Sequence, residues 1–111
     1  MAYDEELAAR IRTQLAGERR LTEKKMFGGL AFLIGGNMAI AASGEGGLLV
    51  RCDPDESDAI VAKTKAELMV MRGKAMQGWL RVGAENARTE RELKRWVETG
   101  AGYARSLPAK K

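Results

Sequence analysis

The apolar positions near the start of the chain recur with the spacing of a helix. Within 4–15 they are Leu7, Ala8, Ile11 and Leu15. These residues fall on one face of a helix, and the acids that precede Leu7 suit the positive end of a helix dipole. The pattern predicts a helix over 4–15.

The next segments alternate between apolar runs and glycine-rich turns. Residues 30–34 and 37–43 are mostly apolar and flank a glycine pair, which readily adopts the positive φ angles of a two-residue hairpin turn. After a second glycine-rich turn, 48–51 is another short apolar run. We predict three successive strands here, and we interpret the charged stretch 18–25 before them as a solvent-exposed connection.

Two later segments have the sequence of a helix start. Asp53 and Glu56 have the spacing of a capping box, with Pro54 at the first helical position. Thr89 and Glu92 repeat this spacing, and an apolar stripe follows them. The two predicted helices extend to about Lys63 and to about Ser106.

A second hairpin is predicted between these helices. The segments 68–71 and 75–82 flank Arg72-Gly73-Lys74, in which Gly73 supplies the turn. The elements then follow one another in the order α-β-β-β-α-β-β-α. No internal repeat or linker divides them, so we expect the whole chain, 1–111, to form one α+β domain.

Both faces of the first two predicted strands are apolar. Leu30 and Phe32 fall on one parity, Ala31 and Ala41 fall on the other, and neither parity carries a charge. One face of an antiparallel sheet is normally solvated. The second apolar face therefore needs cover, either from the terminal helix or from a second copy of the chain, which leaves a homodimer open.

Trp79 is predicted to lie on the polar side of its strand. It shares a parity with Gln77 and Arg81, whereas Met76 and Leu80 share the other. An indole among polar neighbours is either buried beneath a helix or a half-exposed anchor of the kind enriched at interfaces. The sequence leaves both interpretations open.

The composition excludes several kinds of chemistry. The chain has no histidine and a single cysteine, Cys52. The imidazole that most general bases and catalytic triads use is missing, and one thiol forms neither an internal disulfide nor a thiolate metal cage. We therefore expect no enzyme activity, no metal site and no cofactor. An enzyme that relies on Cys52 or on the acidic segment 53–58 is the alternative.

The sequence also bears on where the protein works. Its first residues are acidic and do not form a signal peptide, and no apolar run approaches the ~20 residues that span a bilayer. A lone cysteine is typical of a reducing compartment. We expect a cytoplasmic protein with no membrane partner.

Basic residues gather in two places, although the net charge is only +4. With the terminal lysines, the candidate contacts for nucleic acid are Arg19, Arg20, Lys24 and Lys25. A solvated connection explains the same four residues without a ligand. The second group, near the predicted second hairpin, is Arg51, Arg72, Lys74 and Arg81.

Five short stretches together resemble the TfoX/Sxy N-terminal domain family. They are Lys25-Met26-Phe27-Gly28-Gly29, Gly36-Asn37-Met38-Ala39, Leu49-Val50-Arg51, Met76-Gln77-Gly78-Trp79 and the closing helix from Trp96 to Tyr103. The resemblance covers about 7–107. It implies a two-layer α+β domain with a five-stranded antiparallel sheet, in agreement with the order of elements above.

The resemblance also implies a role. The best-known relatives are bacterial regulators of natural competence that assist a transcription activator and catalyse no reaction. They carry a further helical domain, so this chain resembles a single-domain member. We therefore expect a regulatory adaptor that contacts a protein partner, either the transcription machinery or an activator. The candidate partner surface is Phe27, Arg51, Arg72, Lys74 and Trp79. Direct binding of nucleic acid through the basic residues is the alternative function.

Overall fold

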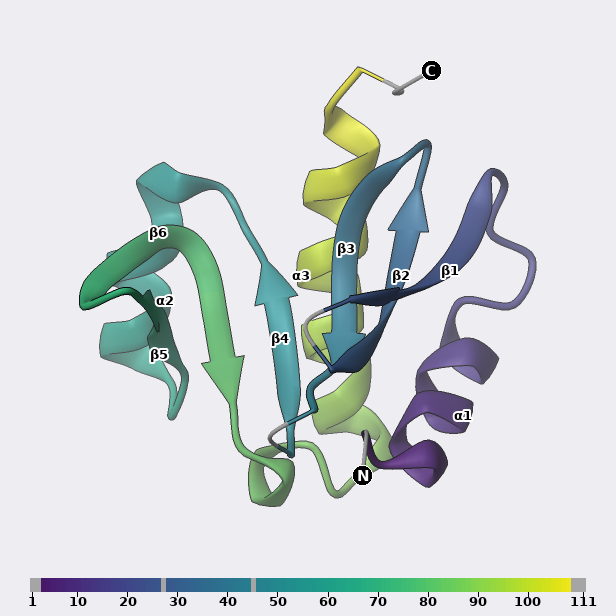
Figure 1. Cartoon of the computed structure of the whole chain (residues 1–111), viewed down its shortest axis with the longest axis horizontal. Coiled ribbons are helices and arrows are strands. Elements are labelled where there is room, and N and C mark those ends of the chain that lie inside the picture. Colours follow the sequence, from purple (N-terminus) through teal and green to yellow (C-terminus); the bar gives the residue numbers. More distant parts are fainter. Residues whose placement is uncertain (1–2, 27, 45, 109–111) are drawn as a thin grey trace.

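The computed structural model describes residues 3–26, 28–44 and 46–108, which form an antiparallel sheet packed against helices (Figure 1). The strands are β1 Leu21–Met26, β2 Gly29–Ile34, β3 Asn37–Ala42, β4 Leu48–Arg51, β5 Glu67–Met71 and β6 Lys74–Val82. Their order in the sheet is β1-β2-β3-β4-β6-β5, and every neighbouring pair is antiparallel. The helices are α1 Glu5–Gln14, α2 Ser57–Lys63 and α3 Glu90–Ser106, with short 3-10 turns η1 Pro54–Glu56 and η2 Ala84–Asn86.

The α+β class and both predicted hairpins are confirmed, but the sheet has six strands and not five. The additional strand is β1, which occupies most of the charged stretch that we interpreted as a connection. That interpretation was wrong because β1 is an edge strand whose four central residues are exposed, so it needs no apolar alternation. Charged side chains on an edge strand also oppose pairing with other chains.

The two predicted helix starts differ in the structure. Asp53 caps η1 by accepting a hydrogen bond from the backbone N–H of Asp55 at 2.9 Å, but the side chain of Glu56 makes no cap at the start of α2. The capping box of α3 is complete. The Thr89 hydroxyl accepts from the backbone N–H of Glu92 at 3.0 Å, and the Glu92 carboxylate accepts from the backbone N–H of Thr89 at 3.1 Å.

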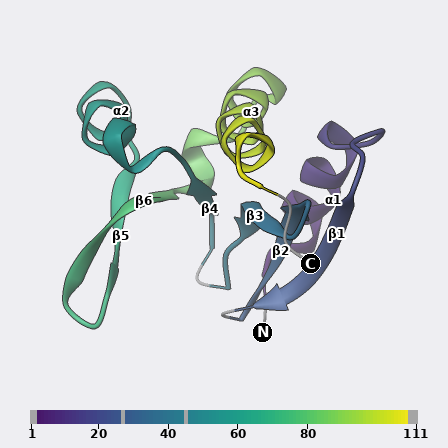
Figure 2. The same cartoon turned by 90° about the horizontal axis from the view of Figure 1, so that it is seen from above.

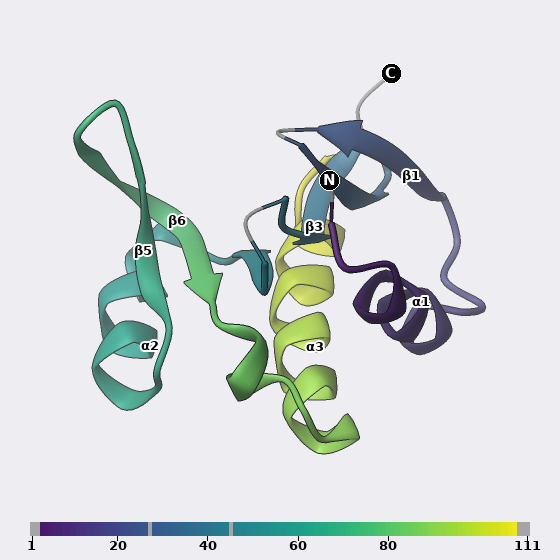
Figure 3. The same cartoon turned by 60° about the horizontal axis from the view of Figure 1, so that its bottom comes forward.

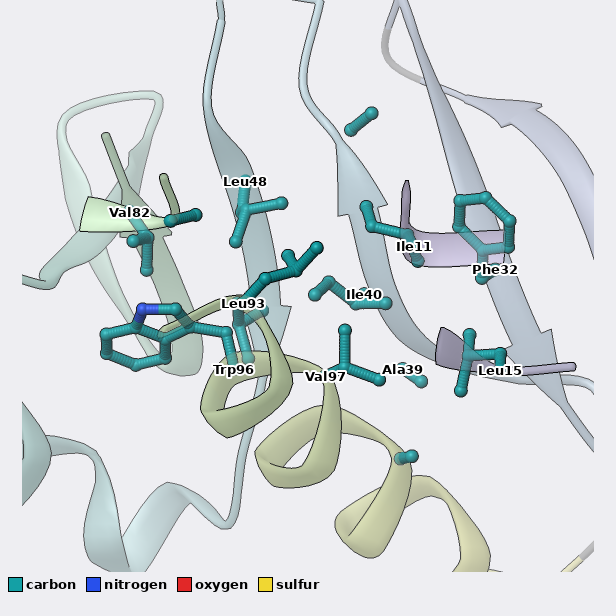
Figure 4. Close-up of a cluster of buried hydrophobic side chains, with 14 of the residues drawn as sticks. Ile11, Leu15, Phe32, Ala39, Ile40, Leu48, Val82, Leu93, Trp96 and Val97 are labelled. Atoms are coloured by element: carbon teal, nitrogen blue, oxygen red, sulfur yellow. The ribbon is translucent and has the colours of Figure 1, made fainter. Parts of the chain in front are cut away.

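All three helices lie on one side of the sheet (Figure 2). Helix α3 crosses β3 and β4, α1 packs beside it, and α2 contacts β5 and β6. The core lies between these two layers, where Ile40 of the sheet meets Leu93 and Val97 of α3, and Phe32 lies beside Ile11 of α1 and Leu15 (Figure 4). The indole of Trp96 is buried in the same layer and donates a hydrogen bond to the carbonyl oxygen of Asn86 at 3.2 Å.

The second apolar face expected from the sequence is present on the other side of the sheet. There Ala31, Met38, Ala41 and Leu49 form a buried cluster separate from the main core. A bulge in the β2–β3 pair places Met38 in this cluster and turns Ala39 towards α3. Since α3 packs on the opposite face, the interpretation that the terminal helix covers this second face is wrong. We call this side the helix-free face.

Candidate functional site on the helix-free face

An apolar strip crosses the helix-free face from β1 to β5. At its centre is the buried cluster of Ala31, Met38, Ala41 and Leu49. The partly buried side chains that pack against this cluster are Met26, Leu33, Met69 and Trp79. Within the described parts of the chain, no helix lies over these side chains. The four central residues are at most 7% exposed, so the accessible part of the strip consists of the partly buried side chains around them.

Two shallow cavities lie along the strip. The first has a volume of about 110 Å³ and is lined by Leu49, Met69, Met71, Met76 and Trp79. The second has a volume of about 70 Å³, shares Leu49 and Met69 with the first, and extends to Met26 and Ala31. Because the cavities share two side chains, they are neighbours on one largely apolar surface, to which Ser43 and Arg81 also contribute at the second cavity.

Methionine is the dominant residue type of this surface. Every methionine in the described ranges either packs in the strip or lines one of its cavities, namely Met26, Met38, Met69, Met71 and Met76. The thioether side chain is unbranched and polarizable, so it adapts its shape to the surface that covers it. A methionine-lined surface is therefore suited to binding another molecule, although methionine also serves as ordinary packing.

Arg51 at the end of β4 lies between two aromatic rings. Its guanidinium carbon is 4.9 Å from the centroid of the Trp79 ring and 5.4 Å from that of the Tyr103 ring. Trp79 is opposite Arg51 in the β4–β6 pair, whereas Tyr103 comes from α3. The pairing of β3 with β4 ends at Val50, so Arg51 lies beyond the last paired position and reaches α3. Both contacts have cation–π geometry.

The position of Trp79 decides between the two interpretations that the sequence left open. The indole is half-buried, lies on the helix-free face and packs against the second cluster and Arg51. Burial beneath a helix is therefore wrong. The prediction that Met76 faces away from Trp79 was also wrong, because the strand bulges at Gly78, where φ is +88°, and both side chains line one cavity.

Lys74 and Arg72 lie at the tip of the β5–β6 hairpin, which projects from the body of the sheet (Figure 3). Arg72 and Gly73 form the turn with φ angles of +54° and +80°. Lys74 lies opposite Met71, whose side chain lines the same cavity as Trp79. Of the predicted partner surface, Trp79 lines this cavity, Arg51 contacts the Trp79 ring, and Lys74 lies opposite the lining residue Met71. Arg72 is exposed at the turn beside Lys74, and Phe27 lies outside the described residues.

The structure does not gather the candidate nucleic-acid contacts on one surface. Arg19 and Arg20 precede β1, whereas Lys24 and Lys25 lie further along it, and adjacent strand residues point to opposite faces. Lys24 lies opposite Ala31 and therefore shares the helix-free face. The terminal lysines lie outside the described residues.

Two acidic residues of the charged stretch 18–25 form ion pairs with arginines on helices. Arg105 hydrogen-bonds Glu18 at 2.6 Å, and Arg12 hydrogen-bonds Glu23 at 2.7 Å. These bonds and the accompanying charge attraction lower the pKa of both carboxyl groups, although partial burial opposes the shift. Both ion pairs connect the β1 region to helices, so they serve the fold.

Cys52 has the environment of a structural thiol. Its side chain is 2% exposed. Burial raises the pKa of the thiol, and the nearby carboxylates of Glu56 and Asp53 raise it further. Since the thiolate is the reactive form, this site opposes nucleophilic chemistry. Among the described residues, no group of three or more Cys, Asp or Glu side chains is arranged to hold a metal ion.

Nothing in the sequence indicated the contact between Arg51 and Tyr103. Tyr103 was placed only in the terminal helix, and no local pattern connects it with Arg51, some fifty positions earlier. The methionines could line a binding surface or serve as core packing on the sequence alone. Their grouping on one face depends on the bulges, because a bulge changes which residues share a face.

The remaining observations concern membrane-spanning helices and similarity to known proteins. Over the residues that the structure covers, none of the helices is both long enough and apolar enough to cross a membrane. The family model described as the TfoX N-terminal domain matches residues 13–104 of the 111-residue chain. No curated protein and no solved structure matches the chain significantly. Because the family model covers most of the sequence, the chain belongs to the TfoX N-terminal domain family.

Proposed function

We propose that this protein is a non-enzymatic regulatory adaptor that works in the cytoplasm by binding a protein partner through the helix-free face. The observation that carries the proposal is the apolar strip, which crosses the sheet without a helix over it and contains two connected cavities. Partly exposed apolar side chains that line open cavities are typical of interaction sites in water-soluble proteins.

The residues around the strip support a protein partner. Trp79 and Arg51 belong to the residue types that most often dominate binding energy at protein interfaces. Trp79 lines the first cavity together with the methionines and Arg51 contacts the Trp79 ring, so an apolar side chain of a partner could enter the cavity near a charged anchor. The family likeness to regulators of competence connects this contact with transcription, and we include that connection in the proposal.

The chemistry of the chain supports a role without catalysis. It has no histidine, and its one cysteine is buried with a raised pKa. The carboxylates at the start of the second helical region are engaged in the fold: Asp53 caps η1, and Asp58 accepts a hydrogen bond from Gln77. These two carboxylates are accounted for by contacts within the fold, which supports a structural role for them.

Affinity capture from the native host tests the proposal. The parent protein is compared with Trp79→Ala and Arg72→Glu, both of which change the proposed surface. Arg95→Glu on the exposed side of α3 is the matched control for charge reversal, because Arg95 lies on the other side of the sheet. We expect the parent and the control to capture the same proteins and the two surface variants to lose at least one of them.

Thermal unfolding of each variant shows whether the fold is retained, so that a lost partner is not a consequence of unfolding. If Trp79→Ala and Arg72→Glu retain every partner of the parent protein, the proposed surface is wrong.

A further inference from the structure

The apolar strip has the dimensions of a peptide-binding site. It reaches from Met26 on β1 to Met71 on β5, and these strands are the two edges of the sheet. Five strand spacings of ~4.8 Å give a length of about 24 Å. A helix of about 16 residues spans that length at 1.5 Å per residue. One amphipathic segment of a partner is therefore sufficient to cover the strip.

Among the residues that the structure describes, the charges on the helix-free face are mostly positive. Lys24 lies opposite Ala31 and Lys74 lies opposite Met71. Arg51 at the end of β4 lies opposite Trp79 and contacts both Trp79 and Tyr103 of α3. All three cations therefore lie beside residues of the strip. None of their side chains has a hydrogen bond or ion pair to any residue that the structure describes. The acid Glu67 on the same face lies directly opposite Arg81. The border of the strip thus complements a negatively charged segment.

Arg51 is also held in a suitable geometry for a carboxylate. Trp79 and Tyr103 contact the guanidinium through their rings at 4.9 and 5.4 Å. Aromatic contacts of this kind leave the N–H groups available, and the guanidinium fork binds carboxylates in a bidentate manner. Since two rings already restrict Arg51, less conformational entropy is lost when a carboxylate binds.

The same charges disfavour a second copy of the chain as the occupant. In a two-fold symmetric dimer, each surface packs against its own copy. Such a contact would bring Lys24, Arg51 and Lys74 of both copies to one interface, where like charges repel. Nucleic acid is also disfavoured, because the centre of the face consists of methyl and thioether groups and not of a row of cations.

We infer that the helix-free face binds an acidic amphipathic peptide segment of the partner. Apolar side chains of the segment occupy the two cavities, one carboxylate pairs with Arg51, and others lie near Lys24 and Lys74. This inference rests on the proposed function and adds the chemistry of the partner to it.

Binding of defined peptides tests the inference. The probe is a fluorescent 16-residue peptide with Leu at helical spacing and Glu and Gln elsewhere. A second peptide has Lys in place of every Glu, and a third has the composition of the first in scrambled order. Fluorescence anisotropy gives the dissociation constant of each for the parent protein. We expect the acidic amphipathic peptide to bind at least about tenfold more tightly than the other two.

Variants of the protein locate the contact. We expect Met71→Glu and Lys74→Glu each to weaken binding of the acidic peptide by about tenfold. Val70→Glu is the matched control, because Val70 is 61% exposed and lies between two strip residues of β5 but on the other side of the strand. It should change the dissociation constant by less than about twofold.

Three results would overturn the inference. They are equal binding of the acidic and the basic peptide, no binding of either peptide, and equal binding of the acidic peptide by the parent protein and both strip variants. A dimer in light scattering that Met71→Glu converts to a monomer assigns the face to a second copy. Competition of duplex DNA with the peptide at physiological salt assigns it to nucleic acid. The capture experiment with Trp79→Ala tests the proposed function separately. A partner that binds there through a neutral or basic segment would support the proposed function and contradict the acidic peptide.

Discussion

Gly100 of α3 packs directly against the carbonyl oxygen of Ala39 on β3. A Cβ atom at position 100 would lie 2.1 Å from that oxygen, closer than any real contact. The absence of a side chain therefore sets the distance between α3 and the sheet. Because the main core lies between these two layers, this contact fixes how tightly the core packs.

Gly100→Ala should destabilise the fold. The added methyl group meets backbone, which moves only if α3 shifts away from β3, so we expect a loss of about 2–3 kcal/mol in the free energy of unfolding. Urea denaturation measures it. Gly102→Ala is the control in the same helix, since nothing lies within 4 Å of a Cβ there. The control should be neutral or stabilising by up to about 1 kcal/mol. Equal stability of both variants would contradict the packing argument.

The capping box of α3 should contribute measurably to stability. Thr89→Ala removes the hydroxyl that accepts from the backbone N–H of Glu92, leaving that group without its cap. We expect the free energy of unfolding to fall by about 1 kcal/mol in urea denaturation. Thr99→Ala removes a hydroxyl that only donates to the carbonyl oxygen of Arg95 inside the helix, and it should change stability by less than about 0.5 kcal/mol. The reverse order of the two effects would be inconsistent with capping.

Local patterns predicted most of the elements because these elements carry their own signals. The capping box at Thr89, the glycine pair between β2 and β3, and the helical stripe of α1 each depend on residues close in sequence. Strand β1 has no such signal. Its exposed edge position imposes no alternation of apolar and polar residues. Glu23 within the strand and Glu18 before it form ion pairs with Arg12 of α1 and Arg105 of α3, and no local pattern in the sequence shows these contacts.

The candidate site could be predicted only in part, because its geometry also depends on contacts between residues far apart in sequence. Arg51, Lys74 and Trp79 were selected from sequence, and the structure places them around one strip. Their arrangement depends on the bulge at Gly78 and on Tyr103, which α3 supplies. Assigning side chains to faces by alternation along the sequence assumes a regular strand. A single bulge therefore reverses the assigned face for every residue beyond it.

The ion pair between Glu18 and Arg105 should make stability depend on pH. The hydrogen bond from Arg105, with the attraction of its charge, lowers the pKa of Glu18 in the folded state. A carboxyl group with a lowered folded pKa adds stability above its unfolded pKa of about 4.3, and this contribution is lost as the pH falls through the folded value.

Glu18→Gln should therefore be less stable than the parent at neutral pH and similar to it at about pH 2.5. Half of the Arg105 side chain is exposed, at 52%, so the difference at neutral pH should stay below about 1 kcal/mol. Urea denaturation at both pH values measures it. Glu85→Gln is the control, because the Glu85 side chain has no hydrogen bond within the described residues. A difference for Glu18→Gln that persists unchanged in acid would show that the carboxylate acts through packing and not through its charge.

The thiol of Cys52 should be unreactive in the native protein. It is 2% exposed, and burial raises its pKa, so little thiolate is present and reagents reach it poorly. Introducing Val70→Cys adds an exposed thiol to the same molecule, since Val70 is 61% exposed. A chromogenic disulfide reagent should then show two phases, with Cys52 at least about 100-fold slower than the new thiol. Denaturant should merge the phases. A parent protein whose Cys52 reacts at the fast rate without denaturant would restore the thiol as a candidate nucleophile and count against a role without catalysis.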